Sequence, residues 1–179
     1  AHEQAMPNEL QLPSAKPILF VANVSEHAGT DDPLLGIVRG LAEKKGARVV
    51  AICGQLEAEL SALPAEERQA YLSELGLHES GLVRLTKAAY DLLALITFFT
   101  AGEEESRAWP VREGTKGPAA AGKIHSDMER GFIRAEVFAY ADLIACGTPA
   151  AVREKGLFRL EGKEYVIKDG DVVYFRFNV

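Results

Sequence analysis

Apolar residues in the first half of the chain form two continuous runs separated by a helical pattern. The runs cover 17–23 and 47–53, and neither alternates with polar residues, which is typical of strands buried on both faces of a parallel sheet. Between them, residues 33–45 place apolar side chains at helical spacing, with Asp31 or Asp32 available as the amino-terminal cap. This order of strand, helix and strand predicts a βαβ unit with parallel strands.

The remaining pattern divides into a helical part and a β-rich part. Helical spacing continues over 55–63, 64–75 and 80–93. From Leu95 onward, short β-rich segments alternate with turn residues, so the boundary between two domains is expected between residues 94 and 95. In the second part we expect a helix over 119–129, a hairpin of strands 95–100 and 107–112, and strands over 132–137, 164–168 and 171–179.

Composition supports a soluble globular protein. The chain has 179 residues, of which 47% are hydrophobic and 26% charged, enough for one full-sized core or two small ones. It contains no run of 18 apolar residues, and residues 1–15 lack the features of a signal peptide, so we expect a cytoplasmic protein with no membrane partner. Cys53 and Cys146 show no C-x-x-C spacing, which favours buried thiols over a disulfide framework or a metal site.

Charge is distributed unevenly along the chain. The net charge is −6, yet the segment 107–134 contains six Lys and Arg residues against three acids. Such an excess can contact RNA phosphates, although dispersed basic residues more often form an ordinary solvated surface. The candidates for contact with RNA or the ribosome are Arg107, Arg112, Lys116, Lys123, Arg130 and Arg134.

One segment matches the spacing of a phosphate-binding loop. Residues 117–123 fit the pattern G-x-x-x-x-G-K. However, Ile124 occupies the place of the Ser or Thr that would bind magnesium, and no apolar strand precedes the segment. We therefore expect no working phosphate-binding loop and assign no catalytic residue to this chain. For the nearby His125 and Asp127, a local hydrogen bond or a helix cap is expected rather than acid–base catalysis.

The motif Asn23-Val24-Ser25-Glu26 follows the first buried strand at its carboxyl end, where open parallel sheets bind ligands. P-loop GTPases carry Asn-Lys-x-Asp at this place and recognise guanine with it. Val24 and Glu26 replace the Lys and the Asp, and the longer acid would crowd the two donors of guanine, which favours another base such as adenine. The alternative interpretation is a strand end with a capping Asn23 and a solvated Glu26.

Cys53-Gly54 follows the second buried strand. This is the place where those GTPases position a backbone loop against the base. The alternative is a simple turn between the strand and the next helix.

Ordered motifs over residues 16–179 together resemble the carboxyl-terminal half of the YchF or Obg-like ATPase family. Two of the segments, Ile124–Asp127 and Asp169–Asp171, are shared more widely with TGS domains. The motifs that carry the resemblance are Asn23-Val-Ser-Glu26, Glu57, Gly76, Ser80-Gly81-Leu82, Leu95 to Gly102, Arg107-Ala-Trp109, Ala120 to Asp127, Gly131 to Glu136, Glu161 to Val166 and Asp169 to Val179.

This resemblance implies a partial P-loop G domain over 1–94, built from a parallel sheet with helices, and an α+β TGS domain of β-grasp fold over 95–179. Members of the family bind and hydrolyse ATP in preference to GTP, with Mg²⁺ as the accompanying ion, and they associate with ribosomes. Carried over by position, the residues that would contact the nucleotide base are Asn23, Val24, Glu26, Cys53 and Gly54.

The sequence departs from the full family pattern because it has no Walker A loop, no switch regions and no helical hairpin. We therefore expect that this chain alone does not hydrolyse nucleotide, and that ATP or GTP with Mg²⁺ belongs to a full-length parent. The alternative function is a stand-alone TGS-type module that binds the ribosome or RNA without nucleotide hydrolysis.

Overall fold

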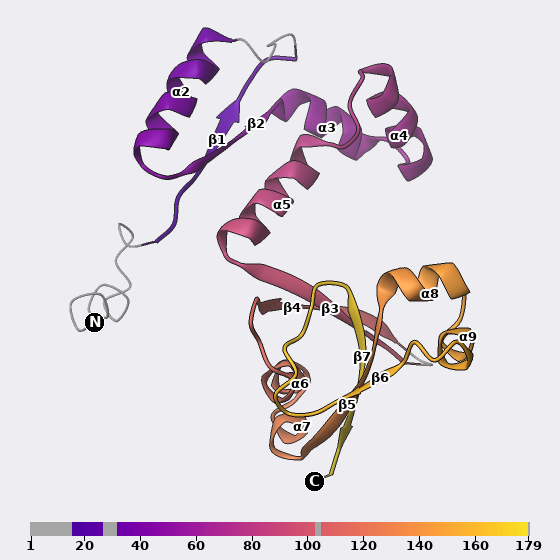
Figure 1. Cartoon of the computed structure of the whole chain (residues 1–179). Helices are drawn as coiled ribbons and strands as arrows, with labels where there is room; N and C mark the ends of the chain where they lie inside the picture. Colours follow the sequence, from indigo (N-terminus) through magenta and orange to yellow (C-terminus); the bar gives the residue numbers. More distant parts are fainter. Residues whose placement is uncertain (1–15, 27–31, 103–104, 179) are drawn as a thin grey trace, which may run out of the picture. The chain divides into compact units, whose positions relative to one another are not determined.

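The chain divides into two compact units (Figure 1). The computed structural model describes residues 16–26, 32–102 and 105–178. The first unit extends to Leu93 and the second begins at Ala94, one residue before the position expected from the sequence. Ala94 has a φ angle of 49°, in the left-handed region that residues with a Cβ atom rarely adopt.

The first unit combines a short parallel sheet with helices. Its strands are paired from Leu19 opposite Arg48 to Asn23 opposite Ile52, so both strands end at the same edge of the sheet. This confirms the predicted βαβ order. The elements are β1 (Leu19–Asn23), α2 (Pro33–Lys44), β2 (Arg48–Ile52), α3 (Gly54–Ala62), α4 (Ala65–Glu74) and α5 (Gly81–Leu92).

Local sequence signals explain where helix α2 begins and ends. The Oδ1 atom of Asp32 accepts hydrogen bonds from the backbone N–H of Leu34 at 2.8 Å and of Leu35 at 3.3 Å, which satisfies donors that the first helical turn leaves free. Of the two predicted caps, Asp32 therefore holds the position, and Asp31 lies outside the described residues. Gly46, with a φ angle of 62°, allows the left-handed turn that follows the helix.

Among its described residues, the first unit buries only a few apolar side chains. Leu56, Leu60 and Leu72 form a small cluster between α3 and α4. By contrast, Val21 of β1 and Ile37 of α2 are 45% and 68% exposed. A two-stranded sheet covers little apolar surface by itself, so both elements keep apolar faces that the described part of this unit does not cover.

The second unit is a five-stranded mixed sheet within the described residues, with strand order β4-β3-β7-β5-β6. The central pair β3–β7 is parallel, whereas β3–β4, β5–β7 and β5–β6 are antiparallel. The elements are β3 (Leu95–Ala101), β4 (Ser106–Arg112), α6 (Gly117–Ile124), α7 (Ser126–Arg130), β5 (Phe132–Ala139), α8 (Tyr140–Cys146), α9 (Pro149–Glu154), β6 (Arg159–Glu161) and β7 (Asp171–Phe177).

Helices cover both faces of this sheet (Figure 1). On one face, Ala120 and Ala121 of α6 pack against Phe98 of β3 in the larger core cluster. On the other, Val152 of α9 packs with Phe138 of β5 in a second cluster. Because side chains alternate along a strand, the same five strands supply both cores. The second unit therefore has a hydrophobic core on each face of its sheet.

Three details of the second unit differ from the sequence-based expectation. The helix predicted over 119–129 is two helices, separated at His125, whose φ angle of −158° is extended. The helices α8 and α9 were not predicted. The expected strand 164–168 is wrong: this segment makes one isolated bridge, between Val166 and Lys116, and β6 pairs with β5 in its place.

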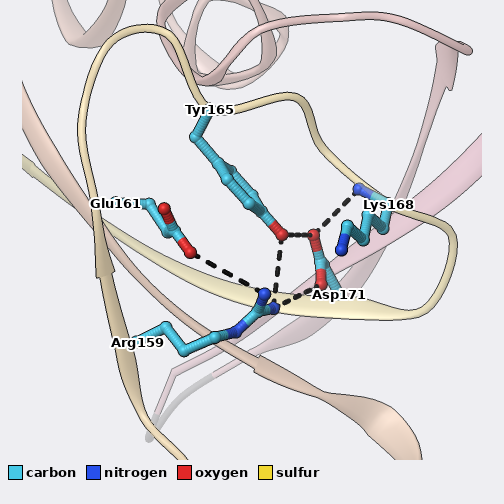
Figure 2. A network of polar contacts seen from close by, with 5 residues as sticks. All are labelled: Arg159, Glu161, Tyr165, Lys168 and Asp171. Carbon is cyan, nitrogen blue, oxygen red and sulfur yellow. Dashed lines mark hydrogen bonds and ion pairs between the residues drawn. The ribbon is translucent and has the colours of Figure 1, made fainter.

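A polar network explains why segment 164–168 is not a strand (Figure 2). The buried carboxylate of Asp171 accepts hydrogen bonds from the hydroxyl of Tyr165 at 2.8 Å, the backbone N–H of Lys168 at 2.9 Å and Nη2 of Arg159 at 3.3 Å. Arg159 also lies 3.7 Å from a carboxylate oxygen of Glu161. These contacts curl the connection around the start of β7 and so set the position of the central strand.

Candidate functional site

The ends of the two parallel strands in the first unit are joined by one side chain. Asn23 is the last residue of β1, and Gly54 follows β2 as the first residue of α3. The Oδ1 atom of Asn23 accepts a hydrogen bond from the backbone N–H of Gly54 at 3.0 Å. The structure therefore brings together two predicted site segments that are separated in the sequence.

The other predicted site residues lie around the same edge of the sheet. Val24, Glu26 and Cys53 line a hollow of about 240 Å³. Val24 and Cys53 are half-buried and Glu26 is exposed, and the backbone N–H of Val24 donates to the carbonyl oxygen of Ile52 at 2.8 Å. The hollow thus has a rigid floor at the strand ends and a carboxylate at its rim.

Glu57 and Gly81 also line this hollow, and Glu57 fixes the position of Gly81. Its carboxylate accepts hydrogen bonds from the backbone N–H of Gly81 at 2.6 Å and of Leu82 at 3.2 Å, so an α3 side chain holds the amino-terminus of α5. An anionic group is also favourable at the positive end of a helix dipole. A Cβ atom at Gly81 would lie 2.9 Å from Oε1 of Glu57 and 2.9 Å from Cγ2 of Ile52. Glycine is therefore the residue that fits this approach.

Two arginines complete the lining of the hollow, and sequence reasoning assigned no role to either. They are Arg39 of α2 and Arg84 of α5. Arg84 donates from Nη2 to the carbonyl oxygen of Ala51 at 3.1 Å, which ties α5 to β2. Only the folded arrangement brings these helices to the strand ends, since neither arginine lies in a local motif.

The chemistry of this edge suits a planar polar ligand. The hydrogen bond to Gly54 uses the side-chain oxygen of Asn23 and leaves its amide nitrogen as a donor. The Glu26 carboxylate supplies an acceptor, and Val24 and Cys53 supply apolar surface. A heterocyclic base offers both donors and acceptors at its edge and apolar faces above and below, which matches these groups.

The segment with phosphate-loop spacing is not a loop. Residues Gly117–Ile124 form helix α6, with Gly117, Ala120 and Ala121 buried. Their backbone N–H groups therefore cannot form a phosphate cradle between a strand and a helix. This confirms the expectation that no phosphate-binding loop is built here.

The neighbouring His125 and Asp127 form a helix cap. Nδ1 of His125 accepts from the backbone N–H of Asp127 at 3.2 Å. The Asp127 carboxylate pairs with Arg130, and this hydrogen bond lowers the pKa of Asp127 below its ordinary value. Both side chains therefore have the structural role that the sequence predicts.

The six predicted basic residues do not gather on one face. Lys116 pairs with Glu164 at 2.6 Å, and Arg130 pairs with Asp127, so two of the six already have carboxylate partners. Each of these two bases has a carboxylate of its own, so each pair presents little net charge to an external phosphate.

The remaining four basic residues are split between the two sides of the sheet. The guanidinium of Arg107 lies 4.4 Å from the ring centroid of Trp109, which packs on the α6–α7 side, and Lys123 is on α6 itself. Arg112 and Arg134 occupy strand positions that alternate with those of that core. Basic residues that lie within one segment of the sequence therefore lie on different sides of the sheet in the structure.

Other classes of site find little support in the described parts of the chain. Within residues 16–26, 32–102 and 105–178, no group of three or more His, Cys, Asp or Glu side chains is placed to hold a metal ion. No helix among these residues is both long and apolar enough to span a bilayer. Cys53 and Cys146 are free, half-buried thiols.

Comparisons with known proteins agree with this architecture. Residues 95–178 match the family YchF-GTPase_C, described as a protein of unknown function (DUF933). The chain is 52% identical, over 180 residues, to the "Ribosome-binding ATPase YchF" of Bacillus subtilis, covering 99% of this chain and 49% of that protein. It is 45% identical, over 179 residues, to the protein of the same name from Escherichia coli O157:H7, covering 100% of this chain and 49% of that protein.

A solved structure gives the same result. The Schizosaccharomyces pombe YchF GTPase superposes with a TM-score of 0.84 at 32% sequence identity, covering 96% of this chain and 46% of that one. The fold and its relatives therefore define a mixed α/β protein that is structurally similar to a YchF GTPase. The chain belongs to the YchF or Obg-like ATPase family and corresponds to its carboxyl-terminal half. It spans about half the length of the curated relatives it matches.

Proposed function

We propose that this chain supplies the base-recognition end of a nucleotide site, with a preference for ATP over GTP, together with a ribosome-binding module. The observation that carries the nucleotide part is the hydrogen bond between Asn23 and Gly54. It joins the two segments that the family pattern assigns to the base and leaves the amide nitrogen of Asn23 as a donor.

The preference for adenine is argued from hydrogen-bond edges. Adenine presents an amino donor and a ring-nitrogen acceptor, and guanine presents two adjacent donors on the edge that an Asp reads. In our proposal the Asn23 amide nitrogen donates to the ring acceptor and main-chain atoms of Val24 receive the amino group. Glu26, which lines the hollow of about 240 Å³, is longer than Asp by one methylene and crowds the two guanine donors.

The domain assignment is part of this proposal. Residues 1–94 would be the carboxyl-terminal portion of a G domain, and the exposed Val21 and Ile37 would be covered by the rest of that domain. Residues 95–179 would be a TGS domain. The parallel central pair β3–β7, flanked by antiparallel strands, is the strand arrangement of a β-grasp sheet and supports that assignment.

Hydrolysis is proposed only for a full-length protein that carries this chain. The described residues form neither a phosphate-binding loop nor a metal-binding cluster, so we assign phosphate chemistry and Mg²⁺ to no residue of this chain. The ribosome partner is taken from the names of the relatives, and a cytoplasmic location would follow from it.

The proposal is tested by exchanging the base-recognition motif. In the full-length protein, the double variant Val24→Lys with Glu26→Asp should lower the affinity for ATP and raise that for GTP, as measured by titration with fluorescent analogues of both nucleotides. The matched control is Val166→Lys with Glu113→Asp, which makes the same chemical changes at two exposed positions of the second unit, outside the residues that line the hollow. An unchanged ATP-to-GTP ratio in the motif variant would refute the proposed role of these residues.

The ribosome part is tested separately, by co-sedimentation of the 179-residue chain with purified ribosomes. Binding that weakens as salt rises would support phosphate contacts, because these contacts release counterions. If the chain binds ribosomes and the motif exchange leaves nucleotide preference unchanged, the alternative of an RNA-binding module without a nucleotide function is favoured.

A further inference from the structure

One face of the sheet in the second unit carries three arginines, two of which bind a single carboxylate. Glu136 of β5 is buried, and its carboxylate accepts from Nε of Arg176 at 3.0 Å and from Nη2 of Arg153 at 3.1 Å. Arg176 comes from β7 and Arg153 from α9. Arg134 of β5 lies on the same face, two residues before Glu136. We call Arg134, Arg153 and Arg176 the arginine face.

The strand register of the arginine face places two positive charges opposite each other, which is unfavourable for stability. Arg134 is directly opposite Arg176 in the antiparallel pair β5–β7, and like charges at opposite positions repel each other. Within the described part of the chain, Arg134 makes no ion pair. Glu136 neutralises one of the three charges, so the face keeps an excess of two positive charges, although the chain as a whole carries −6. A local arrangement that costs stability is expected where a surface has a function.

Two of the three guanidinium groups, those of Arg153 and Arg176, are fixed in place and still open to solvent. The side chains of Arg153 and Arg176 are 62% and 57% exposed, whereas that of Glu136 is 8% exposed. Arg153 is held further by the ring of Phe158, whose centroid lies 4.4 Å from its guanidinium carbon. Both arginines line a hollow of about 240 Å³ next to Tyr174. Donors held in this way lose little conformational entropy when they bind an anion.

We propose that the arginine face binds the phosphate backbone of RNA. An arginine presents a fork of N–H donors that matches phosphate oxygens, and three such groups on one sheet face can follow successive phosphates of a strand. Of the aromatic rings beside them, Phe138 is buried, and Phe158 and Tyr174 are half-buried and packed against each other, so little of their faces is open for bases to stack on. The contact should therefore be independent of sequence. This inference rests on the ribosome part of the proposed function and names the surface that makes the contact.

The decisive variant is Arg134→Glu in the 179-residue chain, tested with a fluorescently labelled RNA duplex. The new carboxylate would face Arg176 across the strand pair and replace a repulsion by an attraction, so the melting temperature should stay the same or rise. RNA binding should weaken about tenfold. The slope of log Kd against log salt should decrease by about one or more, which corresponds to the loss of at least one phosphate contact. A variant that is equally or more stable and yet binds more weakly cannot be explained by misfolding.

The matched control is Lys163→Glu, which makes the same change of charge at an exposed position in the connection before β7. That connection is bonded to Thr115 and Gly117 near α6, away from the arginine face. Equal losses in the two variants would mean non-specific attraction and would overturn the proposal. A larger loss for Lys123→Glu than for Arg134→Glu would place the contact on α6 and overturn it too.

Two further outcomes separate this inference from the proposed function. If the unaltered chain binds ribosomes but not the RNA duplex, or binds polyglutamate as tightly as RNA, the arginine face is a protein-binding surface and the inference fails while the ribosome partner stands. If the chain does not co-sediment with ribosomes at all, the ribosome part of the proposed function fails.

Discussion

The side-chain oxygen of Asn23 accepts a hydrogen bond from the backbone N–H of Gly54 at 3.0 Å, across the ends of two parallel strands. A Cβ atom added at Gly54 would lie 3.3 Å from that oxygen, closer than a side chain usually comes. The bond therefore depends on an amide at position 23, and a side chain at position 54 would require Asn23 to shift by a few tenths of an ångström. It is the geometric link between the two halves of the candidate base site.

Replacing Asn23 by Ala should weaken both the fold and the site. The change removes the acceptor for the Gly54 N–H, which should cost about 1 kcal/mol in the free energy of unfolding, and it removes the donor proposed for the base. Denaturant unfolding of the chain and ATP titration of the full-length protein measure the two effects. Asn178→Ala, at an exposed position in the second unit, serves as the control. Unchanged ATP affinity in Asn23→Ala would contradict the assignment.

Glycine-to-alanine changes should have opposite effects in two helices. At Gly81 the new Cβ atom would lie 2.9 Å from both Glu57 Oε1 and Ile52 Cγ2, so Gly81→Ala must displace the cap of α5 and destabilise the chain. At Gly36 in α2 no atom lies within 4 Å of such a Cβ, so Gly36→Ala should stabilise the chain by about 0.5 to 1 kcal/mol. Thermal unfolding of both variants checks the prediction. Equal shifts would show that the approach of Glu57 to Gly81 is not tight.

Much of the first unit could be predicted from the sequence because its signals are local. The apolar runs ending at Asn23 and Cys53 mark buried strands, and Asp32 and Gly46 mark the limits of α2. Residue order alone also indicated that the strand ends meet, since a βαβ connection makes strands parallel. The contributions of Arg39 and Arg84 to the hollow could not be predicted, because they depend on how helices pack.

Several features of the second unit could not be predicted, because they depend on contacts between distant residues. Segment 164–168 has a β-rich sequence, yet Asp171 captures the hydroxyl of Tyr165 and the N–H of Lys168 and curls the segment away from the sheet. The arginine face could not be predicted either, because its three residues come from three separate elements of the chain, namely Arg134 from β5, Arg153 from α9 and Arg176 from β7. Contacts between such distant residues produce no periodic pattern along the sequence from which they could be predicted.

The network around Asp171 should make the second unit sensitive to alkali. Burial, together with the hydrogen bond to Asp171, raises the pKa of Tyr165 to about 12, compared with an ordinary value of 10.0. Between these values the unfolded chain loses the phenolic proton while the folded chain keeps it in the network. The folded state therefore binds more protons than the unfolded state in this range, and stability falls as pH rises from 10 to 12.

Tyr165→Phe tests this dependence. At neutral pH the variant should lose about 1 kcal/mol, because Asp171 keeps one donor fewer, and the difference from the unaltered chain should shrink as pH rises through the tyrosine range. Denaturant unfolding at several pH values measures it, with Tyr140→Phe, an exposed tyrosine of the same unit, as the control. A difference that stays constant with pH would show that Tyr165 does not titrate in this way.

Glu136 should give the second unit a matching sensitivity to acid. Hydrogen bonds from Arg176 and Arg153 hold the pKa of Glu136 below its ordinary value of 4.5, so this carboxylate contributes stability above pH 4.5 that is lost as pH falls through its lowered pKa. Glu136→Gln should cost about 1.5 to 3 kcal/mol at neutral pH, because the amide has no charge to offset the two guanidinium groups and its NH2 group cannot accept a hydrogen bond from either of them. The free energies of unfolding of the variant and of the unaltered chain, measured at a series of pH values, should therefore converge in acid.

The control Glu113→Gln changes an exposed carboxylate of the same unit. Parallel curves for Glu136→Gln would mean that Glu136 does not hold the arginines.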